Sequence, residues 1–295
     1  MVRPFAFGSN PETLATNAFQ RVGEAPAIAL QAGHEFDGVV ARLERAGVRV
    51  VVAEDDPEPP KPDSVFPNNW LFLAHDGTAW LFPMLSACRR AERRMAILDH
   101  LAECGFQVSR VMDLSHWEQQ GLFLEGTGSM VLDHVHRVAY AALSPRTRHR
   151  PLMDFAARAG YHAHAFTALG PDGEPVYHTN VMMSLGPGFA VACLAAVADE
   201  AERLTLRQSL EAAGRELIEI DPGQMAAFAG NLLAIWREQG GPVIGLSETA
   251  LASLTPAQVR SLERHGEIAD CAIPTIEAYG GGSLRCMLAE VFLPR

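Results

Sequence analysis

Gly280-Gly281-Gly282-Ser283-Leu284-Arg285-Cys286, close to the C-terminal end of the chain, is the stretch that most needs a chemical explanation. A run of glycines lets the backbone approach a ligand closely and adopt positive φ angles. The Cys286 thiol would follow such a turn directly, where it could act as a nucleophile. The alternative is structural, because free cysteine is common in cores and Cys286 could begin a buried strand over residues 287–292.

The composition is that of a folded, acidic protein. The 295 residues are 48% hydrophobic and 20% charged, which is enough apolar material for a sizeable core. No composition shift divides residues 1–295, so we expect a single domain. The formal net charge of −11 argues against a nucleic-acid partner and favours small molecules. Homo-oligomer formation stays open.

The N-terminal residues and the cysteines indicate where in the cell the protein is expected. Residues 1–5 lack the basic and apolar regions of a signal peptide, and no apolar window has the length of a membrane span. We therefore expect a cytoplasmic protein without membrane contact. The five cysteines are an odd number without CxxC spacing, which indicates neither a disulfide framework nor a structural zinc site.

Short apolar runs alternate with helical patterns along the chain. Strands are predicted at residues 48–52, 79–82, 137–141 and 189–193. Helices are predicted at residues 35–46, 92–103, 151–160 and 205–214, and a further one begins with Thr255 as N-cap and Pro256 in its first turn. This order predicts a mixed α/β fold.

Three polar clusters interrupt the apolar runs where a core would not favour them. Asn68 and Asn69 precede a tryptophan, Glu125 ends an apolar run, and His178 precedes Thr179 and Asn180. Each cluster alone has an ordinary explanation, such as a turn or a hydrogen-bonded core residue. Together with the thiol of the glycine-rich stretch, they supply a nucleophile, a base and a carboxylate.

Five motifs of this chain resemble, in the same order, those of the guanidine-modifying superfamily, which includes arginine deiminases, dimethylarginine dimethylaminohydrolases and amidinotransferases. The motifs are Asp63-Ser64-Val65-Phe66, Leu124-Glu125-Gly126, Ser144-Pro145-Arg146-Thr147, His178-Thr179-Asn180 and the glycine-rich stretch ending at Cys286. The resemblance is closest to bacterial citrulline-utilisation hydrolases and extends over the whole chain. It implies an α/β fold, a five-bladed propeller (pentein) of ββαβ repeats around a central active-site pocket, with residues 1–295 as one catalytic domain.

The resemblance also implies roles for individual residues. Cys286 would be the nucleophile, His178 the general acid and base, and Glu125 the carboxylate that binds the substrate nitrogen or orients the imidazole. Arg146 and Arg89 match positions that bind the substrate α-carboxylate, where a guanidinium can make a bidentate contact.

Three further assignments are less sharply defined by the motifs. Arg90 could take the place of Arg89, and both could instead be solvated surface residues. Asp63 matches a position near the amino-acid end of the substrate, or it caps a turn. Gly280 would let the backbone approach the bound substrate.

The departures from the family point to a neutral substrate. Dimethylarginine hydrolases carry a Glu-Asp pair where this chain has Asn68-Asn69, and arginine deiminases carry an aspartate where it has Asn180. Losing these carboxylates leaves a buried cationic guanidinium uncompensated, which costs several kcal/mol. An asparagine offers both a donor and an acceptor, as a ureido group requires. We therefore expect hydrolysis of citrulline to ornithine, carbon dioxide and ammonia.

Two alternatives stay open. Glu125 could still pair with a guanidinium, so the substrate could be arginine, a methylated arginine or an N-acylated arginine. A non-catalytic propeller that acts as a binding protein would have no reason to keep a thiol, an imidazole and a carboxylate on three matching motifs.

No cofactor or metal ion is expected from the proposed chemistry. The pairs His134/His136 and His162/His164 look like ligand pairs, but an i, i+2 pair in a strand is common on a solvated face.

Overall fold

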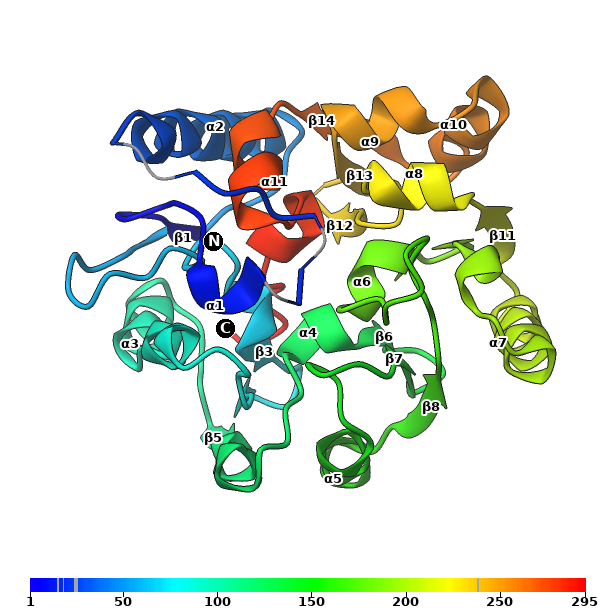
Figure 1. The fold of residues 1–295 in the computed structure, drawn as a ribbon. Helices are drawn as coiled ribbons and strands as arrows, with labels where there is room; N and C mark the ends of the chain where they lie inside the picture. The colour runs from blue at the N-terminus through cyan, green and yellow to red at the C-terminus, as the bar shows by residue number, and fades with distance from the viewer. Residues whose placement is uncertain (15, 18, 24–25, 238) are drawn as a thin grey trace.

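The computed structural model describes residues 1–14, 16–17, 19–23, 26–237 and 239–295. In these residues a three-stranded sheet occurs four times, and Figure 1 shows the sheets arranged around a common centre. In each sheet the first two strands are antiparallel and the third pairs parallel with the second. The strands are β3 (Leu71–Leu73), β4 (Thr78–Leu81) and β5 (Arg110–Asp113); β6 (Val131–Asp133), β7 (Val138–Ala142) and β8 (His162–Phe166); β9 (Met183–Leu185), β10 (Phe189–Ala192) and β11 (Glu216–Glu219); and β12 (Leu233–Trp236), β13 (Pro242–Ser247) and β14 (Glu267–Cys271).

A parallel pair needs a crossover connection, and helices supply it in each of these four units. α3 (Ala96–Glu103) joins β4 to β5, α5 (His149–Ala159) joins β7 to β8, and α7 (Glu200–Ala212) joins β10 to β11. α9 (Glu248–Ser253) and α10 (Pro256–Glu263) together join β13 to β14. These helices lie on the outside of the ring in Figure 1, so the expected ββαβ repeat is confirmed for four units.

The fifth unit combines the two ends of the chain and is the least regular. β1 (Val2–Arg3) pairs parallel with β2 (Ala53–Glu54), and α2 (Pro26–Arg45) connects them. The C-terminal segment lies beside the next unit, because Val291 forms a parallel bridge with Leu73. The five-bladed arrangement is thus confirmed, with a fifth unit whose sheet has two strands in place of three.

The strand predicted at residues 48–52 is wrong, and the strand at residues 287–292, the structural alternative for Cys286, does not form. Residues 48–52 are apolar because Val48 packs into the core, yet they form no ladder, since β1 offers only two residues for pairing. Residues 287–292 contain only the bridge at Val291, because the short helix η5 (Leu284–Met287) occupies the start of that run. An apolar run indicates that its residues are buried. Burial alone does not distinguish a hydrogen-bonded strand from an extended segment without a partner strand.

The residues that mark helix ends in the sequence predict the structure better than the apolar runs do. Gly160 ends α5 in the left-handed conformation with a φ of 70°, and Thr255 forms a capping box with Gln258 at the start of α10. The helix predicted over 92–103 is divided into η2 (Cys88–Glu92) and α3. Further helices are α1 (Pro11–Leu14), η3 (Ser115–Gln120), η4 (Leu194–Ala196) and α11 (Pro274–Gly280). Within the described ranges, no helix is both long enough and apolar enough to cross a membrane.

Short helical turns meet at the centre of the ring. They are η1 (Pro67–Asn69), α4 (Gly126–Ser129), α6 (Thr179–Met182), the turn at residues 227–230 that follows α8 (Pro222–Ala226), and η5. Side chains at three of these turns donate to a backbone carbonyl of the preceding one. The bonds run from Thr127 Oγ1 to Asn68 O (3.3 Å), from Thr179 Oγ1 to Ser129 O (2.5 Å) and from Asn231 Nδ2 to Asn180 O (2.9 Å).

The turns approach so closely that Gly230 has no room for a side chain. A Cβ at this position would lie 2.4 Å from Val181 O and 2.7 Å from Met182 C. Both are backbone atoms of the neighbouring unit, so they cannot rotate away as a flexible side chain could.

We predict that Gly230→Ala lowers the free energy of unfolding by about 2 kcal/mol or more, because the added methyl forces two units of the ring apart. Urea denaturation of the two proteins measures the difference. Gly38→Ala in α2 is the control. Its Cβ would meet nothing within 4 Å, so alanine there should stabilise the protein by about 0.5–1 kcal/mol. A loss no larger than that of an ordinary surface substitution would contradict the tight packing at Gly230.

Candidate active site

The central turns enclose a small pocket of about 10 Å³. Cys286 and the glycines 280–282 line it from one unit, while His178 and Asn69 line it from two others. The ring therefore brings residues that are far apart in the sequence to one space.

Cys286 lies in η5 and is almost fully buried. Its Sγ accepts hydrogen bonds from Asn180 Nδ2 at 3.4 Å and from Asn231 Nδ2 at 3.3 Å. Gly281, with a φ of 65°, ends α11 in the left-handed conformation and turns the chain toward η5. The glycine run thus brings the thiol to the pocket wall, and the nucleophilic role of Cys286 stays a prediction.

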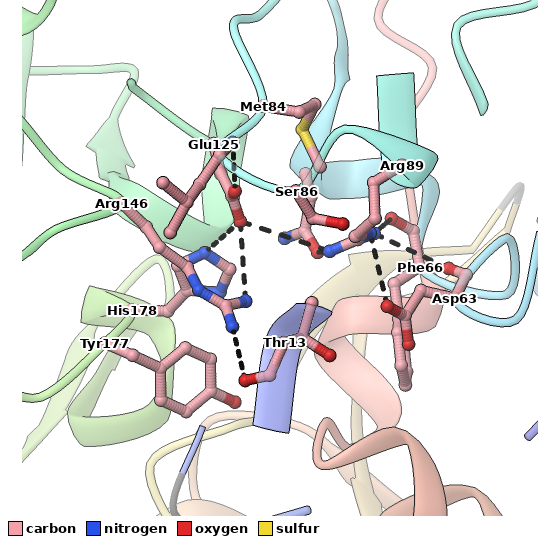
Figure 2. A network of polar contacts seen from close by, with 12 residues as sticks. Thr13, Asp63, Phe66, Met84, Ser86, Arg89, Glu125, Arg146, Tyr177 and His178 are labelled. Carbon is pink, nitrogen blue, oxygen red and sulfur yellow. Dashed lines mark hydrogen bonds and ion pairs between the residues drawn. The ribbon is translucent and has the colours of Figure 1, made fainter. Parts of the chain in front are cut away.

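His178 and Glu125 form a buried pair. His178 Nε2 lies 2.8 Å from Glu125 Oε2, and the imidazole lines the pocket while the carboxylate lies behind it (Figure 2). Burial lowers the pKa of His178 to about 4, against the opposing effect of Glu125. The imidazole is therefore neutral near pH 7 and can accept a proton, while the hydrogen bond to the carboxylate fixes its ring orientation.

Glu125 is the centre of the polar network in Figure 2. Oε1 accepts from Leu85 N at 3.0 Å, and Oε2 lies 3.7 Å from Arg146 Nη1 and 4.0 Å from Arg89 Nη1. Burial by itself would raise the pKa of Glu125, but the Arg146 guanidinium, His178 and Arg89 together lower it to about 2. Glu125 is thus a carboxylate in the folded protein at neutral pH.

The structure places Arg89, and not Arg90, at the pocket. Arg89 is buried, whereas Arg90 donates to the backbone carbonyl of Met84 outside it. Arg89 is already engaged, because Nε and Nη2 donate to the two oxygens of Glu92 at 2.8 and 2.9 Å. Its Nη1 donates to Asn69 Oδ1 at 2.9 Å. Arg89 therefore orients Asn69 in the pocket wall, and its role in binding a substrate carboxylate stays a prediction.

Arg146 reaches the pocket from a different side. Its Nε and Nη2 bond to Thr16 Oγ1, and Nη2 also donates to Thr13 O at 3.2 Å (Figure 2). The guanidinium lies over the Tyr177 ring, 5.2 Å from its centroid. Arg146 Nη1 makes no hydrogen bond in the described part of the chain and lies 3.7 Å from Glu125 Oε2.

Asp63 lines the pocket, and its two oxygens differ in their surroundings. Oδ2 accepts from Asn10 Nδ2 at 2.7 Å and lies 3.6 Å from Arg89 Nε, while Oδ1 is buried and has no hydrogen bond in the described residues. Burial raises the pKa of this carboxyl, against the effect of Arg89 and Asn10. A buried unpartnered acceptor is costly, and an α-ammonium group would satisfy it.

The predicted asparagines differ in their placement. Asn69 lines the pocket, and its Nδ2 has no partner in the described residues. Asn180 Nδ2 contacts Cys286 Sγ, and Oδ1 of the same amide has no partner among the residues that the structure describes. Asn68 is fully buried but does not line the pocket, so the structure does not bring its amide to the site. Gly280 lines the pocket as expected, and a Cβ there would lie 2.7 Å from the Phe66 ring.

Sequence reasoning missed three residues. Asn231 contacts the sulfur, Glu92 holds Arg89, and Tyr177 donates its hydroxyl proton to Gly281 O at 2.6 Å beside the pocket. For Asn231 a signal existed: Gly230-Asn231 precedes a strand as small polar turns do in the other units. Glu92 and Tyr177 gave no comparable signal.

The histidine pairs considered as metal ligands do not line the pocket. His134 Nδ1 lies 2.8 Å from the Tyr161 hydroxyl, and His136 Nδ1 lies 2.9 Å from Asp133 Oδ2. Across the described ranges, no group of three or more His, Cys, Asp or Glu side chains is placed to hold a metal ion.

A larger chamber adjoins the pocket. It has a volume of about 850 Å³ and shares Asn17, Arg146 and Tyr177 with the pocket wall. The pocket itself has room for about one water molecule, which is too little for an amino acid. Thr13 of α1 and Asn17 form part of the pocket wall.

Sequence comparison matches residues 3–293 to the family described as N,N dimethylarginine dimethylhydrolase, eukaryotic. No curated protein sequence matches at a significant level.

Solved structures share the fold at low sequence identity. ArgZ, described as an arginine dihydrolase from the ornithine-ammonia cycle in cyanobacteria, superposes with a TM-score of 0.76 and 16% identity over 100% of this chain. The match spans 40% of the ArgZ chain, whereas it spans 98% of the separate N-terminal domain of ArgZ, with a TM-score of 0.75 and 16% identity. A dimethylarginine dimethylaminohydrolase in adduct with S-methyl-L-thiocitrulline has a TM-score of 0.65 and 15% identity, over 97% of this chain and 96% of that one.

We predict that Glu125→Gln destabilises the protein by about 3 kcal/mol at pH 7, because the folded state lowers the pKa of Glu125 from its ordinary value of 4.5 to about 2. A lowered carboxyl pKa contributes stability above pH 4.5 that is lost as the pH falls toward 2. The difference between the two proteins in urea denaturation should therefore shrink over that window.

Glu277 provides a control of opposite sign for this pH series. Burial raises the pKa of Glu277, so the wild type gains stability as this carboxyl protonates. The destabilisation caused by Glu277→Gln should grow, not shrink, as the pH falls. A Glu125→Gln effect that does not vary with pH would show that the carboxylate charge is not what stabilises the pair.

Proposed function

The chain belongs to the N,N-dimethylarginine dimethylhydrolase family, within the guanidine-modifying superfamily, and we propose that it hydrolyses the ureido group of citrulline through a covalent Cys286 intermediate. The catalytic unit of the proposal is residues 1–295 as one domain. The observation that supports citrulline most directly is the orientation of the Asn69 amide.

Arg89 determines which end of the Asn69 amide faces the pocket. An amide oxygen and nitrogen look alike in outline, so their assignment must come from their partners. Arg89 Nη1 lies 2.9 Å from the amide and can only donate, so Oδ1 must face Arg89. Glu92 holds Arg89 in this position through two hydrogen bonds. The Nδ2 donor of Asn69, which lacks a partner in the described residues, is then the end presented to the ligand.

A donor at this position selects between two substrate groups. A ureido group has a carbonyl that can accept from Asn69 Nδ2, whereas a guanidinium carries only N–H donors and would leave two donors opposed. The tail of the amino acid fits the remaining groups: Asp63 Oδ1 can accept from the α-ammonium, and Arg146 Nη1 can bind the α-carboxylate.

The proposed reaction uses the groups that face the pocket. Cys286 gives its thiol proton to His178 and adds as the thiolate to the ureido carbon, and the carbonyl electrons move to oxygen. These electrons then return to re-form the carbonyl, the carbon–nitrogen bond to the leaving amine breaks, and His178 passes the proton to the departing nitrogen. Water activated by the same imidazole cleaves the remaining thioester-like bond and frees the thiol. The products are ornithine and carbamate, which decays to carbon dioxide and ammonia.

Glu125 stabilises the imidazolium that forms when His178 takes a proton. The neutral resting imidazole, with a pKa lowered to about 4, would otherwise hold a proton poorly in this buried site. The carboxylate 2.8 Å away offsets that cost, as an orienting acid does in other nucleophilic sites.

Arginine is the second candidate substrate, and the same carboxylate favours it. Glu125 is ionised beside the pocket and could compensate a guanidinium, and the similar structure ArgZ is described as an arginine dihydrolase. A substituted arginine would fit the same argument.

A substrate panel tests the proposal. Ornithine and ammonia are measured with citrulline, arginine, dimethylarginine and N-succinylarginine. Citrulline should give the highest kcat/KM, with ornithine and ammonia in equal amounts. A higher kcat/KM for arginine would refute the citrulline assignment.

Cys286→Ser should lower turnover at least about a thousandfold while the fold is retained, because serine is similar in size but offers no accessible anion. Cys271→Ser replaces another buried thiol outside the pocket and should lower stability at most. Circular dichroism and turnover of the three proteins provide the comparison. Activity retained in Cys286→Ser would remove this residue from the mechanism.

We predict that Asn69→Asp shifts binding from citrulline toward arginine, since the donor to the ureido carbonyl is lost and an acceptor for guanidinium is gained. The loss for citrulline should be about 1–3 kcal/mol, or roughly one to two decades in affinity. Calorimetry in a Cys286→Ser background measures both ligands without turnover. Asn180→Asp should shift selectivity in the same direction.

Norvaline, which has the amino-acid tail without either head group, is the ligand control and should bind both proteins alike. If the ratio of arginine to citrulline affinity does not rise, the asparagines do not read the head group of the substrate.

A further inference from the structure

We propose that Asn231 is an additional catalytic residue, whose side-chain amide donates to Cys286 Sγ and holds the sulfur as a hydrogen-bond acceptor. The inference rests on the proposed role of Cys286 as the nucleophile. It gives the fourth unit of the ring, which contributes no motif of the sequence analysis, a direct part in the reaction.

The orientation of the Asn231 amide follows from hydrogen-bond chemistry. Its Nδ2 lies 2.9 Å from Asn180 O, a backbone carbonyl that can only accept, so the nitrogen end must face this carbonyl. The same nitrogen lies 3.3 Å from Cys286 Sγ. One N–H is thus directed at the carbonyl and the other at the sulfur, and a flipped amide would place two acceptors against each other at Asn180. Asn231 Oδ1 lies farther from the sulfur, at 3.7 Å, where it can accept from the neutral thiol but not from the thiolate.

Asn231 is held more firmly than the other amide at the sulfur. Asn180 Nδ2 also lies 3.4 Å from Sγ, but its Oδ1 is buried without a partner in the described residues. That amide can rotate to suit a thiol or a bound substrate. Asn231 cannot, because rotation would break its bond to the backbone of the neighbouring unit. It presents a fixed donor to the sulfur.

A fixed donor matters because the sulfur must attack as a thiolate. An N–H bonds more strongly to an anionic acceptor than to a neutral one, so the contact favours the reactive form of Cys286. Both Asn231 and Cys286 are almost fully buried, so water does not replace the contact. The amide is neutral, and it therefore directs the sulfur without holding it in an ion pair.

The experiment compares Asn231→Leu, which keeps the size of the side chain without its donor, with the wild type. The first readout is the rate of iodoacetamide modification of Cys286 at pH 7.5, followed by mass spectrometry of the peptide that contains it. The second is kcat and KM for citrulline. Modification rate and kcat should each fall about 10- to 100-fold, with KM within about threefold, because a hydrogen bond to a charged group is lost from the nucleophile and not from the substrate.

Gln224→Met is the matched control. Gln224 is a buried amide in α8 of the same unit and donates to Ser253 O at 2.9 Å, away from the pocket. Its replacement should leave the modification rate of Cys286 within about twofold of the wild type. An equal decrease in this control, or an unchanged modification rate in Asn231→Leu, overturns the proposal.

A second variant covers the case in which Asn231→Leu does not fold. Asn231→Ser is smaller, cannot reach both partners, and should also slow modification and lower kcat, so an unchanged rate there overturns the proposal equally. The alkylation readout needs no substrate. A failure of the citrulline assignment therefore appears in the substrate panel alone, and a failure of the Asn231 role appears in the modification rates.

Discussion

Hydrogen bonds from the side chain of one central turn to the backbone of the next are the interactions on which the site depends. Thr127, Thr179 and Asn231 each donate to a carbonyl of the preceding unit, and Gly230 lets the turns approach without a side chain between them. Buried carbonyls need such partners, because each unpaired one costs about 1–3 kcal/mol. Short helical turns leave their last carbonyls without an intrahelical donor. Packing around one axis therefore satisfies their backbone and, as a consequence, points their side chains at a common pocket.

Each buried carboxylate around the pocket has a charged or imidazole neighbour before any ligand arrives, and Asp63 Oδ2 shares Arg89 with Glu92, at 3.6 Å from Arg89 Nε. Glu92 neutralises Arg89 through two hydrogen bonds, and Glu125 lies between Arg146 and His178. Pairing of this kind is required, since an uncompensated buried charge costs several kcal/mol. A zwitterionic amino-acid tail with a neutral ureido head adds no net charge to this arrangement. An arginine adds one positive charge. The choice of substrate therefore depends on two separate factors, which are the charge balance of the pocket and the direction of the Asn69 amide.

The sequence predicted what depends on residue type, and it failed where pairing depends on geometry. Cys286, His178 and Glu125 stand out because thiol, imidazole and carboxylate groups interrupt apolar runs, and the ring does gather them at its centre. Residues 48–52 are apolar because they are partly buried, as the residues of a strand are. Their lack of a ladder partner could therefore not be predicted from the sequence. The role of Asn231 depends on contacts with Asn180 and Cys286, 51 and 55 positions away. Those contacts exist only once the ring closes.

The orientations of the Asn69 and Asn231 amides are determined by partners that lie outside the pocket or away from the sulfur. Asn69 shows its donor to the pocket because Arg89, on the other side, can only donate to it; Asn231 shows its donor to the sulfur because the Asn180 carbonyl can only accept. An amide side chain can present either its donor or its acceptor. In each case a partner that can only donate or only accept determines which end it presents. The chemistry of the pocket is therefore a property of the ring and its supporting ion pairs. A change at Glu92 that released Arg89 would alter which group Asn69 presents, although Glu92 itself does not line the pocket.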